Sequence, residues 1–170
     1  MKLSIVTSVY NSAETLEKFH NTLIGCAENF AKTSFEIIYV NDGSNDKSFE
    51  IGKNIVLNSS PTHNIQLVDL SRNFGQHKAL MTGLNIAKGE KIFMLDSDME
   101  ENPSWLFPLH KKLLETNADV VFGVQEKRRG DFFDRISGAA FYKLFNFLSK
   151  EKIEENLVTA RLMTNRYVNE

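Results

Sequence analysis

The chain has 170 residues, of which 42% are hydrophobic and 25% are charged, enough for one globular domain with a sizeable core. Its 20 basic and 22 acidic residues leave a net charge of -2, which excludes a global electrostatic argument for nucleic-acid binding. The single cysteine, Cys26, excludes an internal disulfide and a cysteine-built metal site. The apolar run before Asn11 is too short for a secretory signal, and no run reaches the roughly 20 apolar residues of a membrane span.

Segments with the patterns of strands and helices alternate along the chain. The predicted strands are residues 3–9, 35–40, 65–70, 91–95 and 119–124. Helical patterns occupy residues 16–30, 46–57 and 76–87, and a further helix begins at Pro103, where Asn102 is the expected cap. This alternation predicts an α/β fold in which helices cover both faces of a mostly parallel sheet, in one domain over residues 1–170.

Polar residues follow the first four predicted strands. In a parallel sheet, ligands bind outside the carboxyl ends of the strands, where such loops meet. The four strands are followed by Tyr10-Asn11, Asn41-Asp42-Gly43-Ser44, Ser71-Arg72-Asn73 and an acidic run that begins at Asp96. We therefore expect these loops to form the functional site at one edge of the sheet.

The acidic run reads IFMLDSDMEENP and holds the carboxylates Asp96, Asp98, Glu100 and Glu101. If residues 96–100 are extended, the side chains of Asp96, Asp98 and Glu100 share one side, where their charges repel unless a cation lies among them. An all-oxygen donor set suits Mg²⁺ or Mn²⁺. The alternative, that these acids only favour the following helix terminus, explains at most Glu101, because Asn102 and Pro103 already supply the cap.

Several motifs occur in order between about Leu3 and Leu144: VTSVYN, VNDGSNDKS, LSRNFGQHKALMTGLNIAKGEKIFMLDSDMEENP and GVQEKRRGDFFDRISGAAFYKL. This set resembles glycosyltransferase family two, and within it the branch of dolichyl-phosphate mannosyltransferase and bacterial polyprenyl-phosphate glycosyltransferases. The resemblance implies the three-layer, Rossmann-like GT-A fold. It also implies a metal-dependent, inverting transfer of a sugar from a UDP- or GDP-sugar, in cell-envelope glycan synthesis.

The resemblance also implies roles for residues of the nucleotide pocket. Tyr10 would offer its ring to the base, and Asp42 would accept a hydrogen bond from it. The other expected substrate contacts are Asn11, Glu14, Arg72, Lys78 and Asp96. The alternatives are that Tyr10 packs in the fold and that Asp42-Gly43-Ser44 is an ordinary turn.

Metal and acceptor contacts follow from the same resemblance. Asp96 and Asp98 match an Asp-x-Asp motif, and Glu100 replaces a glutamine that often helps to hold the metal. We expect Asp98, Arg128 and Arg135 to act in the reaction, and Arg129 and Ser137 to bind the acceptor phosphate, as guanidinium geometry suits. The alternative for Lys127-Arg128-Arg129 is a solvated basic loop.

Three departures from the family pattern stand out. Ser8 occupies a position where many relatives have proline, and Ser12-Ala13 replace acidic residues, which leaves Glu14 as the acidic contact of that motif. Thr159-Ala160 replace the acid and phenylalanine that precede Arg161 in related enzymes, which puts an acidic contact there in doubt.

The acceptor is expected to be a polyisoprenoid phosphate. A phosphate oxygen is already anionic near neutral pH, whereas a sugar hydroxyl would need a carboxylate base, and the candidates Asp131, Asp134 and Glu154-Glu155 do not stand out. Residues 131–149 carry five phenylalanines in an amphipathic pattern, either as a helix packed on the sheet or as a surface that docks on a bilayer. We expect a cytoplasmic protein at the membrane face.

Further expectations concern how much of the catalytic domain the chain contains and which class of protein it belongs to. The chain stops before the extra helices and the transmembrane hairpin of this branch, so we expect a truncated catalytic domain. A sugar nucleotidyltransferase is disfavoured, because VYNSAETL lacks the glycine-rich loop such enzymes need, and a non-catalytic nucleotide-sugar binding module stays open as an alternative. The sequence indicates neither the sugar nor the nucleotide nor the oligomeric state.

Overall fold

The computed structural model describes residues 1–124 and 157–170. Residues 1–122 and 159–170 form one folded unit, and in the second unit, residues 123–158, only the ends of two strands are described. The elements in chain order are β1 (Leu3–Val9), α1 (Leu16–Ala31), β2 (Phe35–Asn41), α2 (Ser48–Asn58), β3 (Asn64–Asp69), α3 (Gln76–Ile86), β4 (Lys91–Met94), the 3-10 turn η1 (Pro103–Trp105), α4 (Leu106–Thr116), β5 (Val120–Val124), β6 (Leu157–Thr164) and α6 (Asn165–Asn169).

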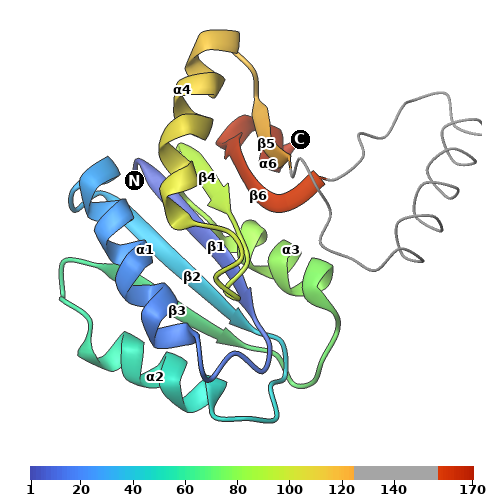
Figure 1. Ribbon diagram of the computed structural model, residues 1–170. Coiled ribbons are helices and arrows are strands. Elements are labelled where there is room, and N and C mark those ends of the chain that lie inside the picture. The colour runs from blue at the N-terminus through green and yellow to red at the C-terminus, as the bar shows by residue number, and fades with distance from the viewer. Residues whose placement is uncertain (125–156) are drawn as a thin grey trace, which may run out of the picture. The chain divides into compact units, whose positions relative to one another are not determined.

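The sheet has six strands in the order β3-β2-β1-β4-β6-β5 (Figure 1). Parallel pairs join β1 to both β2 and β4, and β2 to β3, whereas β4 pairs with β6 in the antiparallel sense. The prediction of an α/β fold with a mostly parallel central sheet is confirmed. The expectation of a single domain over residues 1–170 stays a prediction.

The sequence analysis missed the strand β6 and the short helix α6 that follows it. Ala160 and Leu162 are fully buried, whereas Thr159 before them and Arg161 between them are partly exposed. Over residues 159–162 this alternation is the signal of a strand that is half covered. The expected helix after Asn102 is present, and the Asn102 side chain accepts the backbone N–H of Ser104 at 2.9 Å, but its first turn is a 3-10 turn rather than α-helix.

Helices cover both faces of the sheet, with α1 and α2 on one face and α3 on the other (Figure 1). On the α3 side, Val6 and Val40 of the sheet pack with Ala79 and Leu80 of the helix. Gly83 allows this close approach, since a Cβ there would lie 2.5 Å from the Val6 side chain. The strands β1 and β2 are buried along their whole length, so their carboxyl ends are held rigidly.

A buried carboxylate ties the opposite end of the sheet together. Glu36 is fully buried and accepts hydrogen bonds from the Ser4 hydroxyl at 2.5 Å, the Lys88 backbone N–H at 2.6 Å and the Gln66 side-chain amide at 3.2 Å. These donors come from β1, β3 and the segment before β4. The Glu36 network therefore belongs to the scaffold and lies apart from the strand ends that form the site. Across residues 1–124 and 157–170, no helix has both the length and the apolar character to cross a membrane.

Candidate functional site

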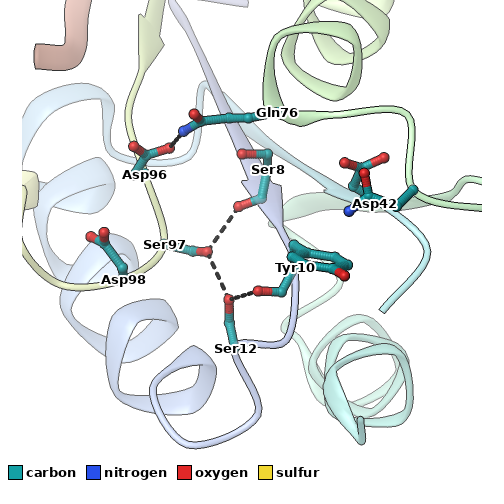
Figure 2. Close-up of a pocket in the computed structure, with 9 residues that line it drawn as sticks. Ser8, Tyr10, Ser12, Asp42, Gln76, Asp96, Ser97 and Asp98 are labelled. Carbon is teal, nitrogen blue, oxygen red and sulfur yellow. Dashed lines mark hydrogen bonds between the residues drawn. The ribbon is translucent and has the colours of Figure 1, made fainter. Parts of the chain in front are cut away.

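A cavity of about 360 Å³ lies at the carboxyl ends of the central strands (Figure 2). Its lining residues come from the end of β1, from the loops after β1, β2, β3 and β4 and from the start of α3: Ser8, Tyr10, Ser12, Asp42, Asn73, Gln76, Asp96, Ser97 and Asp98. The four loops that the sequence predicts to meet therefore do meet. Of the expected site residues, this cavity brings together Tyr10, Asp42, Asp96 and Asp98.

The acidic segment turns, so the condition for Asp96, Asp98 and Glu100 to share one side, an extended segment 96–100, is not met. The strand β4 ends at Met94, Met99 has a φ of 69°, and the Glu100 backbone N–H folds back to the Asp98 carboxylate at 2.9 Å. Asp96 and Asp98 both line the cavity, whereas Glu100 is exposed and is not part of its lining. In the described part of the chain, no three acidic, histidine or cysteine side chains are grouped as a metal site.

Asp96 is held by a side chain from another element. It accepts a hydrogen bond from the Gln76 side-chain amide of α3, drawn in Figure 2. Partial burial raises the pKa of Asp96, and the charge of Asp98 adds to this effect, whereas hydrogen bonding opposes it. Two neighbouring carboxylates in a partly buried site fit an oxygen-liganded divalent cation, whose charge would offset their mutual repulsion.

Ser97 points away from the two aspartates and anchors their loop to β1 (Figure 2). Its hydroxyl donates to the Ser8 carbonyl at 2.8 Å and lies 3.4 Å from the Ser12 hydroxyl. Ser97 is 4% exposed, so this anchor is shielded from water. The Asp96-Ser97-Asp98 sequence thus presents two carboxylates to the cavity and uses the residue between them for attachment.

Asp42 is a structural residue as well as a cavity residue. It is 1% exposed, and its two oxygens accept the backbone N–H groups of Phe74 at 2.7 Å and Gly75 at 2.9 Å. Gly43 follows with a φ of 63°, and a Cβ at this position would lie 2.3 Å from the Arg72 backbone. The turn after β2 is therefore fitted closely to the loop between β3 and α3.

Of the remaining expected nucleotide contacts, only Tyr10 lines the cavity. Tyr10 is 46% exposed, so its ring does not serve core packing. Asn11 joins two loops: its N–H donates to the Ser44 hydroxyl at 3.1 Å, and its side chain accepts the Asn45 N–H at 3.0 Å. Glu14 and Lys78 are exposed and are not part of the lining.

Arg72 belongs to a second cavity, of about 480 Å³, formed mainly by the loops after β2 and β3. Its guanidinium group lies 4.2 Å from the centre of the Phe74 ring, an arrangement that holds the side chain along its own loop. Asn73 lines both cavities. Arg128, Arg129, Arg135 and Ser137 lie outside the described residues, as does the amphipathic segment 131–149.

Several residues of the site were not among the expected contacts. Ser8, Ser12, Gln76 and Ser97 line the cavity. Ser8 is the last but one residue of β1, Ser12 and Ser97 lie in the loops after β1 and β4, and Gln76 begins α3, so nearness to a strand end or helix start is the signal that could have found them. Asn73 lies in a loop that was expected at the site. Glu101 was assigned at most to the helix dipole. It is 6% exposed and accepts the backbone N–H groups of Asp96 and Ala160, both at 2.9 Å, while its burial raises its pKa.

Comparison with known proteins assigns the chain to a family. The model of the family described as Glycosyl transferase family 2 matches residues 4–168. A Mycobacterium tuberculosis (strain CDC 1551 / Oshkosh) protein whose name assigns it to the glycosyltransferases is 40% identical over 99% of this chain and 48% of its own length. The Escherichia coli (strain K12) prophage bactoprenol glucosyl transferase homolog is 34% identical over 99% of this chain and 54% of its own length.

A solved structure supports the fold alone. The mannosyltransferase PcManGT from Pyrobaculum calidifontis, in complex with GDP-Man and Mn²⁺, superposes with a TM-score of 0.68 at 18% identity, over 99% of this chain and 46% of that one. Its GT-A architecture agrees with the sheet and helices described above. This chain spans about half the length of the curated relatives it matches. On the family match and these relatives, the chain belongs to glycosyl transferase family 2, and its fold is GT-A.

Proposed function

We propose that this chain transfers a hexose from a nucleoside diphosphate sugar to a polyprenyl phosphate, with the help of Mg²⁺ or Mn²⁺ and with inversion at the sugar carbon. The observation that carries the proposal is the meeting of Tyr10, Asp42, Asp96 and Asp98 around one cavity at the carboxyl ends of the strands. An aromatic ring and a hydrogen-bond acceptor on one side, with two carboxylates on another, suit a nucleotide and its metal-bound diphosphate.

The donor would bind with its base near Tyr10 and Asp42 and its diphosphate near Asp96 and Asp98. These two aspartates would hold the cation, which when bound neutralises charge that develops on the diphosphate leaving group. The protein side chains contribute placement: Ser97 fixes the aspartate loop to β1, and Glu101 fixes it to β6. The expected ligand Glu100 has less support, because it does not line the cavity.

A polyprenyl phosphate acceptor is supported by similarity to proteins named as bactoprenol glucosyl transferases, at 33% to 34% identity over 99% of this chain. In the proposed reaction, a phosphate oxygen of the lipid forms a bond to the anomeric carbon while the bond from that carbon to the nucleoside diphosphate breaks. The diphosphate leaves with the bonding electron pair, and no proton has to be removed from the nucleophile.

The acceptor phosphate would bind Arg128, Arg129, Arg135 and Ser137, as the family resemblance implies. A lipid substrate also requires access to a bilayer, so we propose that the protein works at the cytoplasmic face of a membrane. In both respects the proposal extends beyond the described residues.

The test is a transfer assay with UDP- and GDP-hexoses, polyprenyl phosphate in detergent, and Mn²⁺ or chelator. We expect one donor to give a glycosyl phosphate lipid by mass spectrometry, with the anomeric configuration inverted, and only when the cation is present. Transfer to a saccharide hydroxyl but not to the lipid would refute the proposed acceptor. Nucleotide-sugar binding without transfer to either acceptor would indicate a binding module instead.

A further inference from the structure

Gln76 is the first residue of α3, and its side chain lines the candidate site. Its amide nitrogen donates to Oδ1 of Asp96, which lies in the loop after β4 (Figure 2). This bond joins a helix to a loop 20 residues further along the chain. The fold alone does not require it, because α3 is already packed on the sheet through Ala79, Leu80 and Gly83.

The two aspartates of the cavity differ in how they are held. Asp98 accepts from the Glu100 backbone N–H, a donor within its own turn. Asp96 accepts from Gln76, a donor on another element. A carboxylate has about four acceptor positions, so a donor fixed on α3 restricts its orientation and still leaves positions for a cation.

Gln76 also ends a short segment that reaches both sides of the cavity. The preceding residues, Phe74 and Gly75, donate their backbone N–H groups to the two oxygens of Asp42 at 2.7 and 2.9 Å. The three consecutive residues 74–76 therefore bind Asp42 at one side and Asp96 at the other. A shift of residues 74–76 would therefore move hydrogen-bond donors of both carboxylates.

We propose that Gln76 is a positioning residue that sets the orientation of the Asp96 carboxylate for the cation and diphosphate, and that residues 74–76 couple this side of the cavity to the nucleoside side at Asp42. The inference rests on the proposed function, since it concerns the same donor site. Glutamine suits the position because its amide donates a hydrogen bond without bringing a positive charge that would compete with the cation for Asp96.

Two substitutions separate the hydrogen bond from the shape of the side chain. Gln76→Met keeps most of the length but removes the donor, and Gln76→Glu keeps the shape but sets a second carboxylate against Asp96. Calorimetry with UDP and with GDP, each with and without Mn²⁺, measures how much the cation strengthens nucleotide binding. Electron paramagnetic resonance measures the binding of Mn²⁺ alone. We expect Mn²⁺-dependent diphosphate binding to weaken about tenfold or more in Gln76→Met and further in Gln76→Glu.

The matched control is Gln66→Glu. Gln66 also donates its amide to a carboxylate, that of Glu36 at 3.2 Å, but this pair lies in the scaffold network and not in the cavity. Its substitution makes the same chemical change and is expected to leave Mn²⁺-dependent binding at the wild-type level. Circular dichroism and thermal melts of each variant identify any loss of the fold itself.

The outcomes distinguish the inference from the function on which it rests. Wild-type binding that depends on Mn²⁺, with both Gln76 variants equal to wild type, would overturn the positioning role and leave the proposed function standing. Equal weakening of metal-free uridine or guanosine binding would also overturn it, because Gln76 would then act on the whole cavity. Wild-type protein that binds neither UDP nor GDP in a Mn²⁺-dependent manner would overturn the proposed function, and the inference with it.

Discussion

The carboxylate of Glu101 accepts the backbone N–H of Asp96 at 2.9 Å, and so closes the loop that carries both candidate metal ligands. Its other oxygen accepts the N–H of Ala160, also at 2.9 Å, in a strand 59 residues further along the chain. With 6% of its surface exposed, this buried side chain links the loop of the candidate site to β6 through hydrogen bonds. A carboxylate can accept both bonds at once, which a primary amide cannot do without turning its own donor toward an N–H.

We therefore predict that Glu101→Gln lowers the free energy of unfolding by about 1–3 kcal/mol, the usual cost of leaving a buried backbone donor unpaired. Urea denaturation followed by circular dichroism measures it. Glu115→Gln is the control, because Glu115 is exposed on α4 and makes only a surface ion pair of 3.9 Å with Lys111. Equal stabilities for both variants would show that the two hydrogen bonds contribute little.

Removal of the Asp98 charge tests the candidate metal pair. We expect Asp98→Asn to lower sugar transfer about a hundredfold or more, because charge stabilisation by a bound cation amounts to several kcal/mol. Asp119→Asn makes the same change at an aspartate that pairs with Arg166 outside the cavity, and it should retain transfer. Mn²⁺-dependent transfer by Asp98→Asn at the wild-type rate would argue against this residue as a ligand.

Gly83→Ala tests the close approach of α3 to the sheet. The added Cβ would lie 2.5 Å from the Val6 side chain and 3.1 Å from that of Val40, so the helix must shift. Overpacking of this kind typically costs about 1–3 kcal/mol, measured by thermal or urea denaturation. Gly25→Ala in α1 is the matched control: nothing lies within 4 Å of its Cβ, so it should stabilise by about 0.5–1 kcal/mol. If both variants were destabilised, the estimate of helix propensity would be wrong and the effect at Gly83 could not be assigned to packing.

His20 predicts a pH dependence of stability. Its burial, and secondly the nearby His63, lower the pKa of His20, whose Nδ1 lies 2.9 Å from the Tyr39 hydroxyl. The unfolded chain then binds more protons than the folded one below about pH 6.5, so this contribution is present above that pH and is lost as the pH falls. Urea titrations between about pH 5 and 7.5 should show a weaker acid loss in His20→Gln than in wild type. Parallel curves would contradict the assignment.

The sequence predicts the strands that are buried throughout and the loops at their ends, because apolar runs and chain order determine both. It does not predict the turn at Met99, since a φ of 69° is typical of glycine or asparagine and nothing in methionine signals it. Asp42 was identified as a site residue, but its bonds to Phe74 and Gly75 depend on the packing of separate strands. The same holds for Glu101, whose partner Ala160 lies in the strand that was missed.

The place of β6 in the sheet has a consequence for biosynthesis. This strand comes after β5 in the chain but lies between β4 and β5, so during translation β4 keeps an unpaired edge until the residues around Ala160 have left the ribosome. Until then Glu101 lacks one of its two donors. A nascent chain that is arrested before β6 emerges would thus have an unpaired strand edge and an incompletely held aspartate loop, which exposes it to edge-to-edge association.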